Sequence, residues 1–148
     1  MEIEVTIHGL MPASNADHQI LVLKPRTDFD GKFIPIWIGE TEASSIRLAL
    51  EETTTARPLT HDLLKTMLSY FKTPLQKVVI YKMVQGTFFA NLHLDNRGTE
   101  ISIDARPSDA ISLALRLKAP VFINEDVYLK QQVRIKENQE IEKINLEG

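Results

Sequence analysis

The sequence contains no cysteine. This absence excludes disulfide bonds, thiolate metal sites and cysteine nucleophiles, and it agrees with a chain that works in a reducing compartment. Apolar runs are also short, and none approaches the roughly 20 residues needed to cross a bilayer. The first residues lack both a basic segment and a long apolar segment, so we expect no signal peptide. Together these absences predict a cytoplasmic protein without a membrane anchor.

The chain has little excess charge of either sign. Its 17 Lys and Arg residues face 20 Asp and Glu residues, which gives a formal net charge of −3. Proteins that coat nucleic acid usually have a strongly basic balance, so this class of function is disfavoured. An enzyme that binds nucleic acid briefly is compatible with the composition, because a local basic cleft can exist on an acidic protein.

The length and composition fit one globular domain. A chain of 148 residues buries enough surface to fold without covalent cross-links. No internal repeat, low-complexity stretch or linker divides it. We therefore expect a single domain over residues 1–129, followed by a charged C-terminal extension over residues 130–148. The isolated apolar residues of this extension, Leu146 among them, suggest that it packs on this subunit or on another, or frays.

Apolar residues in alternation or in short runs predict strands along much of the chain. These patterns lie at residues 3–7, 19–24, 33–38, 77–84, 87–94, 100–103 and 121–123. Pro35 cannot donate a backbone hydrogen bond, so the strand that contains it is expected at a sheet edge or at a bulge. The segment 77–103 reads as a meander of hairpins, which favours antiparallel pairing.

Three segments have the periodicity of amphipathic helices. The first begins after Gly39 and runs to about Glu52, the second begins with Thr60 as its N-cap, and the third opens at Ser108 and stops at Pro120. Helices and meander together predict an α+β fold, with a mixed or mainly antiparallel sheet and three principal helices. The residues expected to be buried are Ile34, Ile36, Ile46, Leu50, Leu64, Leu68, Val79, Phe88, Leu92, Ile111 and Leu115, with Leu63, Met67 and Phe71 on the second helix.

Charged residues gather in three segments where strands or loops lead into helices. These segments are PIWIGETEA at 35–43, RPLTHDLL at 57–64 and DARPSDA at 104–110. The second and third share an order, in which Arg-Pro is followed by a hydroxyl residue and then by Asp in the first helical turn. One interpretation is structural, because such a hydroxyl stabilises a helix N-terminus by typically ~1 kcal/mol and the Asp interacts with the helix dipole.

The other interpretation gathers these side chains around one cleft. Arginines would bind phosphate there, a histidine would serve as acid or base near neutral pH, and carboxylates would hold Mg²⁺ or Mn²⁺. The expected set comprises catalytic Asp104, Asp109, His61 and Asp62, substrate-binding Arg57 and Arg106, and metal-binding Asp104, Asp109, Glu40 and Glu42. No fixed metal motif and no Gly-rich phosphate loop is present, so the spacing alone leaves both interpretations open.

Two further residue types carry weaker signals. Trp37, the only tryptophan, alternates with Ile36 and Ile38, which favours a place in the core or an interface over a base-stacking role. The serines show no nucleophile-elbow pattern, so hydrolysis by a Ser-His-Asp triad has little support from the sequence.

The three charged segments resemble the signature of the bifunctional nuclease family. Their order and spacing match that signature from about Met1 to about Leu129, which is nearly the whole expected domain. The resemblance implies a nuclease that hydrolyses phosphodiester bonds of DNA and RNA, with nucleic acid as its substrate. It implies no agreed set of catalytic residues. One departure is Glu52-Thr53, where the family often has Gly, and it affects a helix end more than the cleft.

Four functions stay open on the sequence alone. They are a nuclease, a non-catalytic module that binds nucleic acid or nucleotides, an oligomeric regulatory or scaffold domain, and a hydrolase of a small phosphorylated molecule. Metal-dependent cleavage would indicate the first or fourth, salt-dependent binding without turnover the second, and tight self-association alone the third. We also expect a homodimer, because an edge strand near Pro35 and an apolar-dotted tail leave surface to cover.

Overall fold

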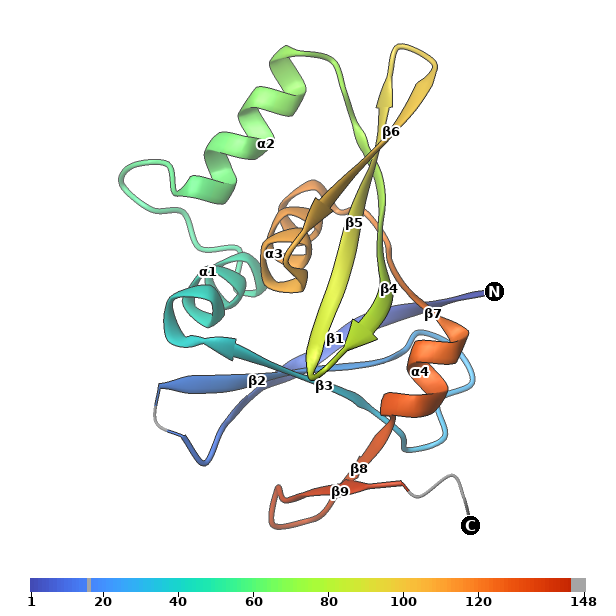
Figure 1. Cartoon of the computed structure of the whole chain (residues 1–148). Coiled ribbons are helices and arrows are strands. Elements are labelled where there is room, and N and C mark those ends of the chain that lie inside the picture. The colour runs from blue at the N-terminus through green and yellow to red at the C-terminus, as the bar shows by residue number, and fades with distance from the viewer. Residues whose placement is uncertain (16, 145–148) are drawn as a thin grey trace.

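The computed structural model describes residues 1–15 and 17–144 (Figure 1). Its elements are β1 (Glu2–Pro12), β2 (His18–Pro25), β3 (Ile34–Gly39), α1 (Glu40–Leu50), α2 (Thr60–Tyr70), β4 (Leu75–Val84), β5 (Thr87–Asn96), β6 (Thr99–Ala105), α3 (Pro107–Leu117), β7 (Val121–Asn124), α4 (Glu125–Gln131), β8 (Val133–Ile135) and β9 (Ile141–Lys143). The predicted α+β class is confirmed. The prediction of three principal helices is wrong by one, since the described residues contain four.

Within the described residues, seven strands form one curled sheet in the order β3-β2-β1-β7-β4-β5-β6 (Figure 1). All neighbouring pairs are antiparallel except β4 and β7, which confirms a mixed and mainly antiparallel sheet. Pro35 lies in β3 at one edge, as the sequence predicts. Strand β1 extends past the predicted segment, because a register shift near Gly9 interrupts the alternation without ending the strand.

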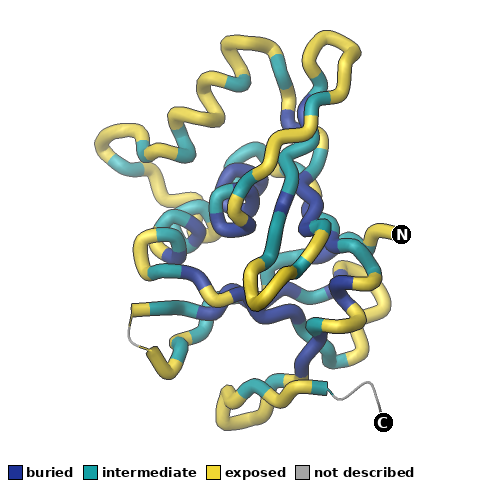
Figure 2. Tube along the Cα trace, in the orientation of Figure 1, coloured by how far each residue is buried: buried dark blue, intermediate teal, exposed yellow. Residues whose placement is uncertain are grey.

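The core lies between the sheet and the helices α1 and α3, where the trace is darkest in Figure 2. Five residues of the predicted core are buried, namely Ile34, Ile36, Ile46, Val79 and Ile111. Four others, Leu68, Phe88, Leu92 and Leu115, are partly buried and pack against the core. The prediction is wrong for Leu50 and Leu64, which are 41% and 39% exposed.

Helix α2 contradicts the prediction of a buried apolar face most clearly. None of its residues, all of which the structure describes, is fully buried. Leu63 and Met67 are 55% and 43% exposed, and Tyr70 and the adjoining Phe71 are 81% and 63% exposed. The helix packs mainly against α3 and projects away from the sheet, so that most of its trace is exposed in Figure 2. Its apolar face is therefore uncovered in the single subunit.

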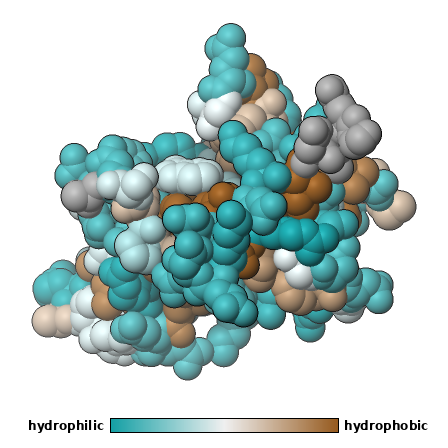
Figure 3. Space-filling view, turned by 90° about the horizontal axis from the view of Figure 1, so that it is seen from below, coloured by the Kyte–Doolittle hydropathy of each residue, from teal (hydrophilic) through white to brown (hydrophobic). Residues whose placement is uncertain are grey.

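The C-terminal segment packs on its own subunit as far as the structure describes it. The predicted boundary at residues 129 and 130 falls inside α4, whose seven residues are too few to show a helical period in the sequence. Val133 is buried and exchanges backbone hydrogen bonds with Phe33. Residues 145–148, including Leu146, lie outside the described residues. Seen from below, the surface is largely hydrophilic, with apolar patches between polar side chains (Figure 3).

Candidate functional site

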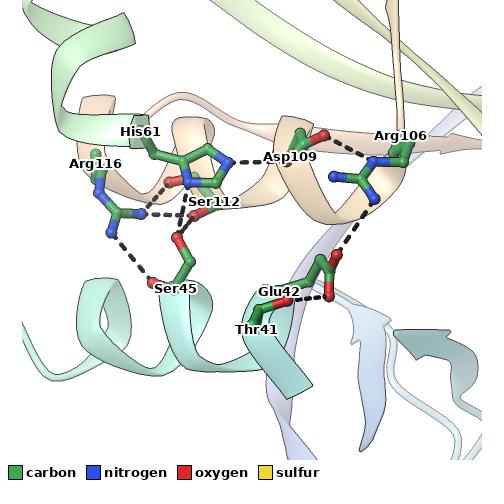
Figure 4. Close-up of polar contacts among 8 residues, drawn as sticks. All are labelled: Thr41, Glu42, Ser45, His61, Arg106, Asp109, Ser112 and Arg116. Carbon is green, nitrogen blue, oxygen red and sulfur yellow. Dashed lines mark hydrogen bonds and ion pairs between the residues drawn. The ribbon is translucent and has the colours of Figure 1, made fainter. Parts of the chain in front are cut away.

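Side chains from α1, α2 and α3 form one connected polar network (Figure 4). Its members are Thr41, Glu42, Ser45, His61, Asp62, Arg106, Asp109, Ser112 and Arg116. Helix α1 contributes side chains from its first two turns and α2 from its first turn, while α3 contributes a polar row of Asp109, Ser112 and Arg116, with Arg106 just before it. Helix packing therefore joins segments that lie more than 60 residues apart in the sequence.

His61 lies at the centre of the network. Its Nδ1 atom is 2.8 Å from the Ser45 hydroxyl, its Nε2 atom is 3.0 Å from Asp109 Oδ1, and its side chain is only 12% exposed. An ionised carboxylate can only accept, so in the neutral imidazole Nε2–H donates to Asp109 and Nδ1 accepts from Ser45. This is the arrangement in which a carboxylate orients an imidazole that takes a proton on its other side.

Asp109 joins His61 to the cation Arg106, whose Nε donates to Asp109 Oδ2 over 2.9 Å. Burial raises the pKa of Asp109, but the hydrogen bonds from Arg106 and His61 outweigh burial and hold this pKa below its ordinary value. Arg106 Nη1 also donates to Glu42 Oε1 at 3.3 Å. One guanidinium thus lies between two carboxylates, and its side chain is still 66% exposed. The site therefore has a solvent-exposed arginine, and the two carboxylates beside it give the cluster a net negative charge.

Arg116 holds the opposite, buried end of the network, with a side chain that is 7% exposed. It donates to Asp62 Oδ1 at 2.9 Å, to the Ser112 hydroxyl at 2.6 Å and to the carbonyl oxygen of Ser45 at 3.2 Å. The Ser112 and Ser45 hydroxyls are 2.7 Å apart. Since Ser45 donates to His61, Ser112 must donate to Ser45. The hydrogen bonds therefore all run in one direction: Arg116 donates to Ser112, Ser112 to Ser45, Ser45 to His61, and His61 to Asp109.

The two Asp residues that follow the Arg-Pro pairs have different roles. Asp62 Oδ2 accepts the backbone N–H of Leu59 at 2.8 Å, and this bond, which outweighs burial, lowers the pKa of Asp62. Asp62 therefore caps α2, as the structural interpretation proposed, whereas Thr60 is not the N-cap and that prediction is wrong. Ser108 is also not a cap, because α3 begins at Pro107 and Ser108 is buried. Asp109 contacts His61 and Arg106 instead.

Three predicted site residues form hydrogen bonds outside this network. Asp104 accepts from the Tyr81 hydroxyl at 3.0 Å, and Glu40 accepts from the Gln19 amide at 2.8 Å. Arg57 is exposed in the loop before α2, where its carbonyl oxygen accepts from Thr55. The predicted convergence thus holds for Glu42, His61, Arg106 and Asp109, with Asp62 joined to them through Arg116.

The four carboxylates predicted to hold a metal are divided in the same way. Among residues 1–15 and 17–144, no three His, Asp or Glu side chains gather closely enough to hold an ion by themselves. Glu42 and Asp109 share Arg106 as a neighbour, while Glu40 and Asp104 have other partners. The described part of the chain therefore offers two neighbouring carboxylates at the network and no complete cage.

The network opens onto two adjoining cavities. The smaller, of about 360 Å³, is lined by Ser45, His61 and Asp109 together with Glu42 and Arg106. The larger, of about 770 Å³, lies between β3, the turn from β4 to β5, the start of α3 and the segment from α4 to β9. Glu42 and Arg106 line both cavities, so the two cavities meet at these side chains.

Comparison with known sequences identifies the family. The Bifunctional nuclease domain matches residues 21–136, which is most of the chain. The chain belongs to the bifunctional nuclease domain family. It is 34% identical over 124 residues to an uncharacterized protein of Mycobacterium tuberculosis, and the match covers 84% of this chain and 73% of the relative. The family resemblance seen in the sequence is confirmed.

Several plant relatives of this chain are named bifunctional nucleases. The chain is 31% identical to Bifunctional nuclease 1 of Arabidopsis thaliana and 30% identical to Bifunctional nuclease 1 of Oryza sativa subsp. indica. These matches cover 85% and 82% of this chain but only 39% and 37% of the plant proteins.

In the part of the chain that the structure describes, no helix is long and apolar enough to cross a membrane.

The buried end of the network is expected to stabilise the fold. Changing Arg116 to Ala should lower the free energy of unfolding by about 3 kcal/mol, because Asp62 Oδ1 and the two oxygens of Ser112 lose the hydrogen bonds that Arg116 donates. Arg26→Ala is a matched control, since Arg26 is 62% exposed and pairs with Glu4 on the surface. This control should cost less than about 1 kcal/mol. Equal small losses in urea unfolding would contradict a structural role for Arg116.

Proposed function

We propose that this protein hydrolyses phosphodiester bonds of nucleic acid at the site formed by His61, Asp109 and Arg106. The observation that carries the proposal is the hydrogen-bond chain from Ser45 through His61 to Asp109, which ends beside a solvent-exposed arginine in a cavity. Membership of the bifunctional nuclease domain family supports this reaction class. Each part of the site matches a need of phosphoryl chemistry: a proton acceptor, a group that orients it, and a phosphate-binding cation.

Water is the nucleophile in this proposal. The water oxygen attacks phosphorus while the bond from phosphorus to the leaving sugar oxygen breaks. The proton released by water passes to His61 Nδ1 by way of the Ser45 hydroxyl, while Nε2–H stays bonded to Asp109. The imidazolium then supplies the proton that the leaving oxygen needs. Ser45 thus relays the proton, and Asp109 stabilises the charge that His61 gains.

Arg106 is assigned to the phosphate group. Its guanidinium is exposed and can bind two phosphate oxygens at once. Glu42 and Asp109 accept hydrogen bonds from this guanidinium. The two carboxylates carry two negative charges, and Arg106 neutralises one of them. An arriving phosphate would therefore benefit from additional positive charge at this point.

We propose Mg²⁺ or Mn²⁺ as the source of that charge. Magnesium is usually bound by one or two carboxylates together with substrate phosphates, and Glu42 and Asp109 fit that donor set. Such an ion would neutralise charge on the phosphoryl oxygens. Its binding would replace part of the contact between the two carboxylates and Arg106. Both carboxylates line the smaller cavity, and the Glu42 side chain is 24% exposed against 35% for Asp109.

The decisive experiment measures cleavage of single- and double-stranded DNA and RNA by purified protein. Fragments are expected with Mg²⁺ or Mn²⁺, none with EDTA, and Arg106→Ala should lower kcat/KM by roughly a hundredfold because it removes the cation aimed at the phosphate. Wild-type activity retained by Arg106→Ala, prepared in the same way, would assign the cleavage to another site or to a contaminant. Salt-dependent binding without cleavage under any condition would favour the non-catalytic alternative.

We also propose that the protein is a homodimer formed through α2. The apolar side chains on one face of this helix are Leu63, Leu64, Met67, Tyr70 and the adjoining Phe71. From their exposed fractions they present on the order of 500 Å² of apolar surface. This is about the apolar share of one partner's ~800 Å² in a standard-size interface. The second candidate function is an oligomeric regulatory domain, and the exposed apolar face of α2 is the observation that favours it.

A further inference from the structure

The larger cavity has the chemistry of a binding site, although the chain of hydrogen bonds described above lies outside it. Its volume of about 770 Å³ is in the range of small-ligand pockets. Trp37, Met83 and Phe88 contribute apolar and aromatic surface to its walls. Among the described residues that line it, Arg106, Lys130 and Lys143 contribute positive charge, against one carboxylate, that of Glu42. The cavity walls are thus basic on a protein whose formal net charge is −3.

Trp37 is the unusual residue of this wall. It is 51% exposed, while Ile36 and Ile38 on either side of it are 4% and 6% exposed. The sequence favoured a core or interface role for Trp37, and the core role is wrong. Alternation along β3 turns this ring to the face opposite the buried isoleucines. A half-exposed indole beside arginine and lysine offers a flat surface on which a planar ligand can stack.

We propose that this cavity binds an unpaired nucleotide base, stacked on Trp37, with its phosphate on Arg106. The proposal rests on the proposed function, since Arg106 and Glu42 are shared with the cleft that contains His61. A base held by Trp37 with its phosphate on Arg106 would bring that phosphate to the smaller cavity, which Ser45, His61 and Asp109 also line. Bases inside a duplex have both faces stacked, so only single-stranded or flipped-out nucleotides can present a face to the indole. The inferred substrate is therefore single-stranded nucleic acid.

A second observation supports a polar ligand in the same place. His18 lines this cavity, and its Nδ1 atom is buried without a hydrogen-bond partner among the described residues. Buried polar atoms are normally paired, so a rotation of the imidazole that turns this nitrogen into the cavity becomes favourable when a ligand group or water is there to bond it. The edge of a nucleobase carries both donors and acceptors, and it can meet His18 while the face of the base lies on Trp37.

The single tryptophan makes the inference directly measurable, because all tryptophan fluorescence comes from Trp37. Titration of the His61→Ala protein, which should bind without turnover, is expected to quench this fluorescence with single-stranded oligonucleotides and with nucleoside monophosphates. A duplex of the same sequence should quench much less at equal nucleotide concentration. Equal quenching by duplex and single strand, or none by either, would overturn the proposal.

Kinetics with the active protein supply a second measurement. Trp37→Leu is expected to raise KM for a single-stranded substrate by roughly tenfold through loss of stacking, while Trp37→Phe should stay near the wild-type value. Phe29→Leu is the matched control, since Phe29 is a 43% exposed aromatic residue outside the cavity. An unchanged KM in Trp37→Leu would also overturn the proposal.

The two proposals can fail separately. Quenching by single strands without cleavage by any preparation would refute the nuclease and leave the base site in place. Cleavage that depends on His61 while Trp37 responds to no nucleotide would refute the base site and leave the nuclease in place.

Discussion

Replacing His61 by alanine is expected to lower the rate of phosphodiester cleavage by roughly 10²–10⁴-fold, the usual contribution of a general base. The physical reason is that His61 Nδ1 receives the proton of water through Ser45 in the proposed mechanism, and Nε2 links the ring to Asp109. The measurement is kcat on the preferred substrate, followed by the thermal midpoint of each variant. Activity within a few-fold of wild type would refute the assignment of His61.

The same substitution, Asp to Asn, at two positions provides a matched control for the assignment of the His61 site. Asp109→Asn removes the charge that orients His61 and holds Arg106, so kcat should fall nearly as far as in His61→Ala. Asp104→Asn changes only a carboxylate that accepts from Tyr81 on a neighbouring part of the sheet. It should keep activity within several-fold of wild type. The sequence predicts loss of activity for both, so abolished cleavage in Asp104→Asn would restore that earlier assignment.

Ser45→Ala distinguishes the two nucleophiles that the geometry permits. If water attacks, a second water can occupy the space of the lost hydroxyl and kcat should fall by less than about tenfold. If the Ser45 oxygen attacks phosphorus itself, cleavage should disappear as completely as in His61→Ala. The second result would replace water by Ser45 in the mechanism and would leave His61 and Asp109 in their roles.

The sequence predicted those parts of the site that are local to a motif. In both Arg-Pro segments the Asp follows at the start of a helix, and helix starts that face one another bring such residues together. The pattern could not say which Asp caps a helix and which binds His61, because that depends on the neighbours α1 and α3 provide. Asp62 meets the Leu59 backbone and Arg116, whereas Asp109 meets His61 and Arg106.

Ser45, Ser112 and Arg116 were missed for a related reason. One signal was present, since Ser112 and Arg116 lie four residues apart on a helix that is otherwise mostly apolar, and such polar pairs inside a buried face must find partners. The partner is on α1, and only the packing of α1 against α3 shows which serine it is. The role of each residue is thus set by a contact between helices far apart in the chain.

The error over α2 has a different physical origin. Periodicity shows that a helix has an apolar face, but it does not show what covers that face. The periodicity predicts that the chain's own core buries Leu64, but this residue is 39% exposed, next to the still more exposed Leu63. An amphipathic helix with an uncovered face is expected to find its cover in another molecule. A second copy of the chain is the partner that we propose.

The wild-type protein is therefore expected to sediment at twice the 16.8 kDa of one chain at micromolar concentrations. The double change Tyr70→Glu and Phe71→Glu should raise the dimer dissociation constant by roughly a thousandfold, since it removes two aromatic anchors and would bury two carboxylates. Both side chains are exposed in the subunit, at 81% and 63%, so the fold of the monomer should persist. Leu129→Glu, at a 44% exposed position on α4, is the control and should stay dimeric.

The outcome also decides between two interfaces. A wild-type monomer across this concentration range would refute dimerisation by either route. A dimer that survives the α2 double change would instead indicate the β3 edge around Pro35, where the sequence predicts pairing.

The β3 edge borders the cavity that contains Trp37. A dimer formed there would cover the proposed base site, so the quenching of Trp37 fluorescence by nucleotides should fall as protein concentration rises. A dimer formed through α2 leaves this cavity open, because none of the residues that line it belongs to α2. Quenching measured at two protein concentrations therefore tests the dimer interface independently of its mass.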